Sequence, residues 1–221
     1  MKQHPIEAAR LSGIYLVTPD AQRCFDAVLD IVKTSLEAGV RAVQYRDKTA
    51  DAATRSTRAS ELAALTRAAG ALLIVNDNID VAISAGADGV HLGRDDGDIA
   101  EARRRLPHQL IGVSCYDKLE YARLPIAAGA DAIAFGSMYA SRTKPAAVRA
   151  PLSLLTAARA AWPRQRIIAI GGINVDNVAD IAAAGAHAAA VIDAIFGAEN
   201  PAQAARDLVR RFDEGQRRSH T

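Results

Sequence analysis

Short hydrophobic segments alternate along the chain with longer segments whose apolar residues recur at a helical period of about 3.6 residues. The short segments are Ile14 to Thr18, Ala42 to Tyr45, Leu72 to Val75, Gly89 to Leu92, Leu110 to Val113, Ala132 to Phe135, Ile167 to Ile170 and Ala188 to Ile192. They are continuously apolar, which is typical of strands buried on both faces. The longer segments, which we predict to be helices, include Phe25 to Ala38, Ala52 to Ala69 and Pro201 to Phe212. Strands that alternate with helices pair in parallel through crossover connections.

A repeated tripeptide, Ala-Gly followed by Ala or Val, divides the chain into quarters. Its glycines are Gly39, Gly86, Gly129 and Gly185, and an apolar segment follows each copy within a few residues. Glycine at this place fits the left-handed residue that ends a helix. Quarters of two strands each predict a closed α/β fold, the (β/α)8 TIM barrel, which leaves no strand at an edge. An open doubly wound sheet is the alternative.

We expect a single domain over residues 1–221, because no linker or low-complexity segment interrupts the pattern. Residues 1–12 are interpreted as a lead-in to the first strand. Residues 213–221 are interpreted as a polar, frayed tail.

Composition excludes several classes of protein. Lys and Arg number 27 and Asp and Glu 25, and the resulting net charge of +2 is too small for a nucleic-acid-binding protein. Half of the residues (50%) are hydrophobic, which excludes an intrinsically disordered chain. No apolar run approaches the roughly 20 residues that span a membrane, and the N-terminus lacks a signal-peptide core. The two cysteines, Cys24 and Cys115, form neither a disulfide framework nor a CxxC zinc motif, so we expect a cytoplasmic protein with reduced thiols.

Functional residues of such a barrel lie where its strands end. After the second apolar segment, Gln44, Arg46 and Lys48 share one face by strand alternation. An amide and two cations suit a planar polar group beside a phosphate. A solvated basic loop is the alternative.

Acidic residues follow the next two segments. Asp77, with Asn76 beside it, follows one, and Asp95 and Asp96 follow the other. Carboxylates on adjacent strand ends suit Mg²⁺ that carries phosphate oxygens. The alternatives are a helix N-cap at the Asn-Asp-Asn sequence and an acidic first helical turn at the Asp pair.

Three other residues near strand ends carry reactive or polar groups. His91 is interpreted mainly as an imidazole packed at the barrel rim, with a general base as the alternative. Ser114 either donates to a phosphate or caps the next helix. Cys115 has no histidine near it in sequence, so a nucleophilic thiol has little support.

The last strand ends predict a phosphate site. A long loop, residues 136–145, places hydroxyl groups beside Lys144. Gly171 and Gly172 follow the seventh segment, and a helix starts after the eighth, an arrangement that binds phosphate through backbone N–H groups in this fold. Together with the basic and acidic strand ends, this predicts a site for two anionic groups.

Read in order, these segments resemble the thiamine-phosphate synthase family over nearly the whole chain. The resemblance rests on VQYRDK, VNDNIDVA, AGADGVHLGRDD, IGVSCYD, the Ser-Arg-Thr-Lys-Pro loop and IAIGGI. It implies a (β/α)8 barrel and an Mg²⁺-dependent transferase. In the implied reaction, a hydroxymethylpyrimidine pyrophosphate loses pyrophosphate by a dissociative mechanism, and the nitrogen of a thiazole phosphate, or of its carboxylated form, attacks the methylene carbon.

The resemblance also implies roles for individual residues. Gln44, Arg46, Lys48 and Asn76 are implied to bind the pyrimidine pyrophosphate, and Asp77 and Asp96 to bind Mg²⁺. Ser114 and Lys144 are implied to bind the released pyrophosphate. The implied contacts of the thiazole phosphate are Ser141, Thr143, Gly172, Ile192 and Asp193. The catalytic role falls to Arg46, Ser114 and Lys144, which stabilise the leaving group.

The chain departs from the family pattern in three places. Asp193 stands where the family commonly has Ser, and a carboxylate beside a phosphate repels it. Arg94 replaces the usual Gln, and Ser137-Met138-Tyr139 replaces a Pro with an aromatic pair.

Other functions stay open from the sequence. They are a thiazole tautomerase-like paralogue, a non-catalytic phosphate-ligand binding barrel and a sugar-phosphate epimerase. The expected partners are small-molecule substrates, with no nucleic acid and no membrane, and a homo-oligomer is left open.

Overall fold

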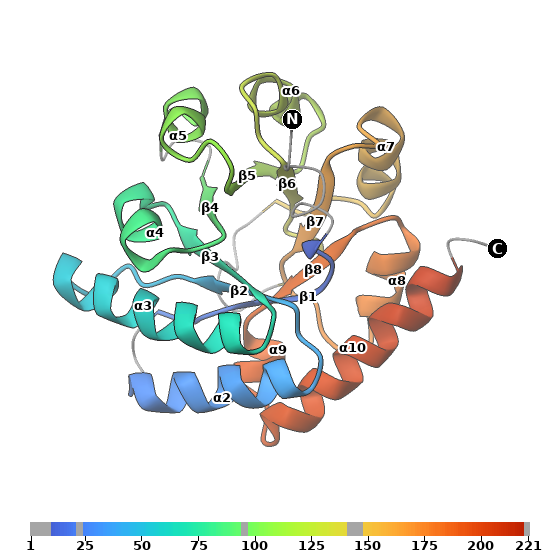
Figure 1. Cartoon of the computed structure of the whole chain (residues 1–221). Helices are drawn as coiled ribbons and strands as arrows, with labels where there is room; N and C mark the ends of the chain where they lie inside the picture. The colour runs from blue at the N-terminus through green and yellow to red at the C-terminus, as the bar shows by residue number, and fades with distance from the viewer. Residues whose placement is uncertain (1–9, 21–23, 94–96, 141–147, 219–221) are drawn as a thin grey trace.

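Eight parallel strands close into a barrel in the computed structural model, which describes residues 10–20, 24–93, 97–140 and 148–218 (Figure 1). The strands are β1 (Gly13–Val17), β2 (Ala42–Tyr45), β3 (Leu72–Asn76), β4 (Gly89–Leu92), β5 (Leu110–Tyr116), β6 (Ala132–Phe135), β7 (Arg166–Ile170) and β8 (Ala188–Val191). Each pairs with its sequence neighbours, and β1 pairs with β8 in register Tyr15 to Ala190. This closing pair confirms the TIM barrel and overturns the open sheet.

Helices surround the barrel, and within the described residues they lie on its outer side (Figure 1). They are α2 (Phe25–Glu37), α3 (Ala52–Ala68), α4 (Ile79–Ala85), α5 (Ile99–Arg105), α6 (Glu120–Ala127), α7 (Ser153–Ala161), α8 (Val178–Ala183), α9 (Asp193–Phe196) and α10 (Pro201–Arg218). Every predicted strand and helix is present, with ends that differ from the prediction by up to three residues except at the C-terminus.

The prediction of a frayed tail after Phe212 is wrong for residues 213–218, because α10 continues to Arg218. Residues 219–221 lie outside the described residues. Its last turns pack on α8, and Gly215 is buried there. A Cβ atom at Gly215 would collide with the carbonyl oxygen of Ala179. The missing side chain therefore lets the two helices approach closely enough to bury the end of α10.

The repeated Ala-Gly sequence ends a helix in every quarter, and its glycines have positive φ angles from 63 to 105. The second residue after the glycine has a role that the sequence did not reveal. Asp88 accepts a hydrogen bond from the Leu73 N–H, and Asp131 accepts one from the Ile111 N–H. The ring of His187 accepts one from the Ile167 N–H. In the second, third and fourth quarters, this side chain therefore holds a neighbouring strand by a hydrogen bond at the N-terminal end of the barrel. The first quarter has Arg41 at this position.

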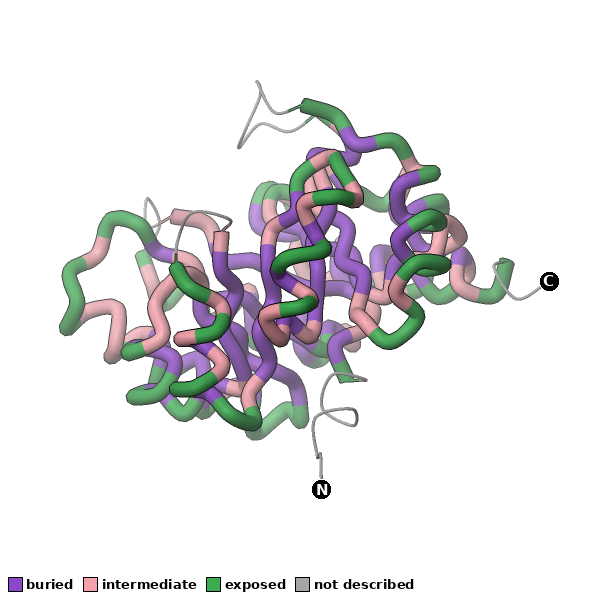
Figure 2. The backbone as a smooth tube through the Cα atoms, turned by 90° about the horizontal axis from the view of Figure 1, so that it is seen from above, coloured by how far each residue is buried: buried purple, intermediate pink, exposed green. Residues whose placement is uncertain are grey.

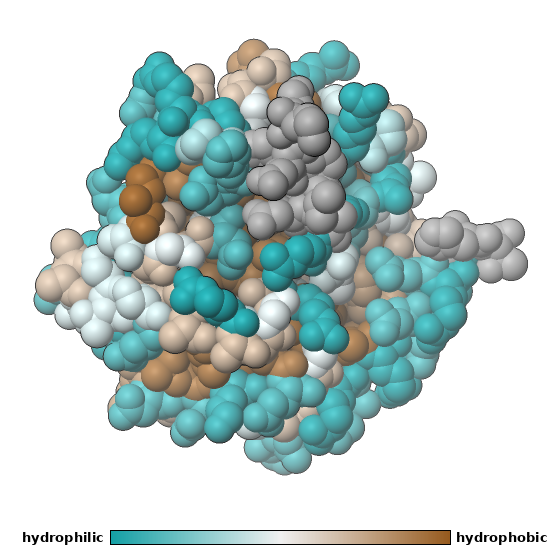
Figure 3. Space-filling model, viewed as in Figure 1, coloured by the Kyte–Doolittle hydropathy of each residue, from teal (hydrophilic) through white to brown (hydrophobic). Residues whose placement is uncertain are grey.

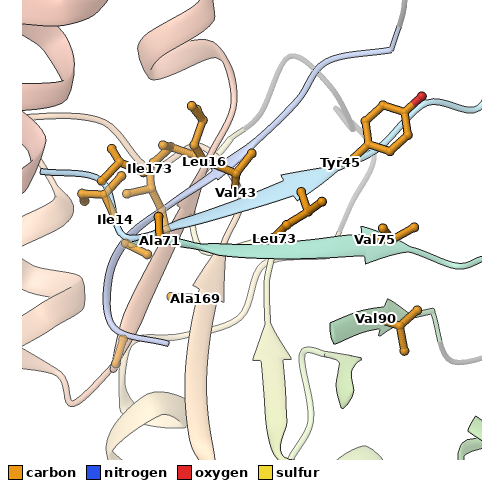
Figure 4. Packing of buried hydrophobic residues seen from close by; sticks show 14 of the residues in the cluster. Ile14, Leu16, Val43, Tyr45, Ala71, Leu73, Val75, Val90, Ala169 and Ile173 are labelled. Atoms are coloured by element: carbon orange, nitrogen blue, oxygen red, sulfur yellow. The ribbon is translucent and has the colours of Figure 1, made fainter. Parts of the chain in front are cut away.

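The strands pack on both faces. Their outward side chains, among them Leu16, Val43 and Leu73, form one cluster with the helices (Figure 4). Their inward side chains form a second cluster that contains many alanines, such as Ala42, Ala134 and Ala190. Figure 2 shows the buried strands at the centre and exposed residues along the helices. The abundant alanine therefore lies inside the barrel as well as on its helices.

On the face seen in Figure 3, apolar side chains form small areas separated by hydrophilic ones. Among the described residues, no helix combines the length and the apolar character that crossing a membrane requires.

Candidate active site

The predicted site residues of β2 to β5 lie at the C-terminal end of the barrel. Asn76 and His91 are register partners on β3 and β4, and His91 is also paired with Gly112 on β5. Gln44 on β2 and Ser114 on β5 occupy the same side of their strands as Ala42 and Gly112, because side chains alternate along a strand. Polar side chains of four consecutive strands thus face the mouth of the barrel.

Gln44 is buried at 5% exposure, deeper than a residue of a solvated loop. Its Nε2 donates a hydrogen bond of 2.9 Å to the hydroxyl oxygen of Tyr15 on β1. Burial raises the pKa of Tyr15 above its ordinary value, with the Gln44 hydrogen bond opposing this more weakly, so the phenol stays neutral. No chemical role for Tyr15 was predicted from the sequence.

The carboxylate of Asp20, which was not predicted from the sequence, contacts both Arg46 and the backbone of Lys48. Arg46 Nη1 lies 2.6 Å from Oδ2 of Asp20, and the Lys48 backbone N–H donates to Asp20 Oδ1 at 3.1 Å. Thr18 exchanges two further hydrogen bonds with the Arg46 backbone. Thr18 and Asp20, which follow β1, therefore hold the start of the loop after β2 in place. The order YLVTPD before an apolar helix was a visible signal, but only the β1–β2 pairing shows what Asp20 contacts.

Asp47 has a structural role between these two cations. Its carboxylate accepts hydrogen bonds from Thr49, from the Ala50 N–H and from Arg58 at 2.6 Å. Burial alone would raise the pKa of Asp47, but these hydrogen bonds outweigh it and lower the pKa. The guanidinium of Arg58 also lies 4.9 Å from the Phe25 ring centroid.

Asp77 directly follows β3, adopts a left-handed backbone with φ 61 and lines a cavity together with Lys48 and Asn76. Oδ2 accepts a hydrogen bond of 2.5 Å from Asn76 Nδ2 and lies 3.7 Å from Lys48 Nζ. Oδ1 accepts from the Gly93 N–H at 3.4 Å. The N-cap alternative applies to Asn78, whose side chain accepts from the Val81 N–H and starts α4. Asp77 does not cap this helix and instead contacts Asn76, Lys48 and Gly93.

A cavity of about 510 Å³ opens beside these residues, between the loops that follow β2 and β3. Lys48, Asn76 and Asp77 are among the residues that line it. The carboxylate of Asp77 fits Mg²⁺, which takes one or two carboxylates and completes its shell with phosphate oxygens and water. Asn76 presents its Nδ2, not its oxygen, to this carboxylate. Within the described residues no three acidic, His or Cys side chains gather into a metal cluster. Asp96, the second predicted ligand, and Arg94 lie outside the described residues.

His91 and Ser114 form a pair inside the mouth. Nε2 of His91 lies 3.0 Å from Oγ of Ser114. Ser114 does not cap the next helix, α6, whose N-cap residue is Leu119. Burial lowers the pKa of His91 to about 4, so the ring is neutral at pH 7. This favours the packed imidazole over a general base.

Cys115 is fully buried, and burial raises the pKa of its thiol to about 12. Since the thiolate is the nucleophile, Cys115 is inert, as the sequence predicted.

The segment after β6 lies directly on the end of β7. The N–H groups of Met138 and Tyr139 donate to the carbonyl oxygens of Ile170 and Gly171. A Cβ atom on Gly171 would meet Ser137, and one on Gly172 would lie 2.8 Å from Cβ of Tyr139. Positive φ angles of 102 and 64 at Gly171 and Gly172 also exclude most side chains. The predicted Ser141, Thr143 and Lys144 lie outside the described residues.

Ile192 and Asp193 begin α9 at the end of β8. Asp193 is exposed, and Ile192 is half-buried and packs against the cluster inside the barrel. The carboxylate of Asp193 is therefore free to point toward solvent while its backbone N–H stays at the helix start.

Comparisons of sequence and structure relate this chain to known proteins. A family model described as thiamine monophosphate synthase matches residues 14–195. The thiamine-phosphate synthase of Chromobacterium violaceum is 52% identical over 205 residues, which cover 92% of this chain and 97% of that protein. That of Halorhodospira halophila is 47% identical over 210 residues, covering 93% and 97%. A solved thiamine phosphate pyrophosphorylase from Pyrococcus furiosus superposes with a TM-score of 0.84 at 32% identity, covering 94% of this chain and 98% of that one.

Proposed function

Because the chain belongs to the thiamine monophosphate synthase family, we propose that it joins 4-amino-2-methyl-5-hydroxymethylpyrimidine pyrophosphate to a thiazole phosphate, or to its carboxylated form. The products are thiamine phosphate and pyrophosphate, and the enzyme is a transferase. The single observation that supports this best is the ordered polar row of Gln44, Asn76, His91 and Ser114 across four neighbouring strands, with Asp77 beside it.

The proposed reaction breaks one bond and forms one. The C–O bond between the pyrimidine methylene and pyrophosphate breaks first, and its electron pair leaves with pyrophosphate. The thiazole nitrogen then donates its lone pair to the methylene carbon to form the C–N bond. Such a step depends on stabilising the leaving group more than on a strong base, which agrees with a neutral, buried His91.

On the pyrimidine side, Gln44 and Asn76 would hold the ring from the barrel interior. Arg46 and Lys48 would meet the pyrophosphate, with Asp20 holding Arg46 in place. Asp77 and Asp96 would hold Mg²⁺, which when bound supplies positive charge to the pyrophosphate oxygens. Ser114 and Lys144 would donate hydrogen bonds to the departing pyrophosphate.

On the thiazole side, Ser141 and Thr143 would contact the substrate. The N–H groups of Gly172, Ile192 and Asp193 would bind its phosphate, since a helix start and a glycine turn both present free donors. The proposal includes a cytoplasmic location, small-molecule substrates and neither nucleic acid nor membrane as a partner.

The test is to incubate the purified protein with Mg²⁺ and both substrates and to assay products. We expect pyrophosphate and thiamine phosphate in equal amounts. No product at saturating substrate would exclude the synthase. Isomerisation of the thiazole phosphate without the pyrimidine, followed by NMR, would instead favour the tautomerase-like alternative.

A further inference from the structure

Asn177 occupies the N-cap position of α8, but its side chain does not cap this helix. An asparagine at an N-cap ordinarily accepts a hydrogen bond from an N–H group of the first helical turn. The amide of Asn177 instead reaches back to the two-glycine turn after β7, formed by Gly171 and Gly172. Helix capping therefore does not explain this side chain, and the proposed reaction gives it no role.

Two hydrogen bonds fix which end of the Asn177 amide faces which group. Nδ2 donates to the carbonyl oxygen of Gly172 at 3.1 Å, and Oδ1 accepts from the Asn174 N–H at 2.9 Å. Both partners are backbone groups, so the carbonyl can only accept and the N–H can only donate. The amide therefore has a single orientation, with its nitrogen on the two-glycine turn.

The peptide group before Gly172 is held by a different segment. The Tyr139 N–H donates to the carbonyl oxygen of Gly171 at 2.9 Å. In a planar trans peptide the N–H points opposite to the C=O, so the Gly172 N–H points away from Tyr139. Within the described part of the chain this N–H has no hydrogen-bond acceptor, and it can therefore donate to a ligand.

The two-glycine turn depends on such restraints. Glycine has more backbone freedom than any other residue, and Gly171 and Gly172 have φ angles of 102 and 64. The next residue, Ile173, is anchored by its side chain, which is 5% exposed in the outer cluster (Figure 4). Tyr139 holds the peptide group before Gly172, and Asn177 holds the one after it. A turn ordered in advance loses little conformational entropy when a ligand binds.

We propose that Asn177 is a positioning residue that holds the two-glycine turn in the conformation that binds the phosphate group of the thiazole substrate. This inference rests on the proposed function, in which the Gly172 N–H donates to that phosphate. Asn177 itself does not contact the substrate. Without the Nδ2 donor, the peptide group between Gly172 and Ile173 is free to rotate, and the phosphate has to order the turn as it binds.

The test compares two substitutions at Asn177 with the same two at Asn174, in the full-length enzyme. Asn177→Ala removes the whole amide, whereas Asn177→Asp removes the Nδ2 donor and keeps an acceptor for the Asn174 N–H. Asn174 is the matched control, because its Oδ1 accepts from the Asp176 N–H in the same loop. Asn174→Ala and Asn174→Asp therefore reproduce the loss of an amide and the added charge.

Steady-state kinetics provides the first measurement. Both Asn177 variants should raise the KM for the thiazole phosphate about tenfold, which corresponds to the loss of about one hydrogen bond. The KM for the pyrimidine pyrophosphate should stay unchanged, because the proposed contacts of this substrate lie on other strands. The Asn174 variants should change either KM by less than about twofold.

Isothermal titration calorimetry separates phosphate recognition from a general structural effect. It compares the thiazole phosphate with the thiazole alcohol, which lacks the phosphate group. The Kd of the alcohol divided by that of the phosphate should fall about tenfold in the Asn177 variants, because only the phosphate contacts the turn. This ratio should stay unchanged in the Asn174 variants.

Asn177 variants that behave like the Asn174 variants would overturn the inference. Equal losses of affinity for the alcohol and the phosphate, or a higher KM for both substrates with a lower Tm, would also overturn it, because they indicate a purely structural role. Asn177→Asp keeps the test decisive if Asn177→Ala does not fold. Absence of turnover in the wild-type enzyme would instead refute the proposed function, so the two failures are distinguishable.

Discussion

The hydroxyl oxygen of Ser114 lies 3.0 Å from Nε2 of His91, inside the mouth of the barrel. Burial keeps the ring neutral, with a pKa of about 4 for His91. When Nε2 carries the proton of the neutral ring, it donates to Ser114 and leaves the serine O–H to donate to a substrate oxygen.

Ser114→Ala should accordingly lower kcat by about 10- to 100-fold, the range for a hydrogen bond to a charged group. Steady-state kinetics with both substrates measures this, and Ser60→Ala on the exposed face of α3 is the control. An unchanged kcat would show that Ser114 contributes only to packing.

Replacing the carboxylate of Asp77 should remove most of the metal-dependent activity. We expect Asp77→Asn to lose at least about 100-fold in kcat/KM and to require more Mg²⁺, because an amide is a weaker ligand than a carboxylate. Chelation with EDTA should abolish wild-type turnover, and added Mg²⁺ should restore it. Asp80→Asn is a matched control, since Asp80 lines the same cavity but pairs with Arg105. Equal metal requirements in the two variants would refute the role of Asp77.

Alanine substitutions at Gly172 and Gly70 distinguish the cost of a strained backbone from the cost of a steric contact. Their φ angles are 64 and 65, but a Cβ at Gly172 would lie 2.8 Å from Tyr139 Cβ, whereas nothing lies within 4 Å of one at Gly70. Gly70→Ala should lower the free energy of unfolding by about 1 kcal/mol, because alanine is strained in the left-handed conformation. Gly172→Ala should lower it by about 3 kcal/mol, because the steric contact adds to this strain. Urea unfolding of both variants measures the difference. Similar losses of unfolding free energy in the two variants would show that the segment after β6 moves aside at little cost.

His187 makes stability depend on pH. Burial is the main cause that lowers its pKa to about 3, and the charges of Arg159 and Arg166 lower it further. The unfolded chain takes up a proton near pH 6.5 and the folded one only near pH 3, so stability is complete above pH 6.5 and falls as the pH drops through this window.

Because His187 is partly exposed, we expect the free energy of unfolding to fall by only about 2 kcal/mol between pH 7 and pH 4. His187→Asn, which keeps an acceptor for the Ile167 N–H, should show a smaller loss in urea titrations at each pH. His108→Gln, at an exposed position, is the control. Identical pH profiles for wild type and His187→Asn would exclude His187 as the source.

Asp193 lies exposed at the start of α9, and if its carboxylate faces the thiazole phosphate it weakens binding of this substrate. A charge at about 4 Å in water is worth about 1 kcal/mol, so Asp193→Ser should lower the KM for this substrate about fivefold, with a smaller effect at high salt. Asp176→Ser, on an exposed loop, controls for net charge. An unchanged KM in Asp193→Ser would show that the carboxylate points away from the phosphate.

Much of the site could be predicted from the sequence because strand alternation and strand ends are local properties. Gln44, Asn76 and Ser114 were found in this way. Asp20 was missed because it follows β1 and meets Arg46 only across the β1–β2 pairing. Tyr15 was missed because an apolar strand gives no sign that a tyrosine oxygen reaches a neighbouring strand.

The sequence by itself determined the alternation of strands and helices, the quarters and the identity of the polar strand ends, since these depend on side-chain period and on glycine at helix ends. Only the tertiary structure decided what those polar groups contact. Closure of β1 on β8 places Tyr15 between alanines. The close approach of α10 to α8 at Gly215 stabilises as helix a segment that was expected to be frayed. Contacts between distant segments depend on packing, which no local pattern encodes.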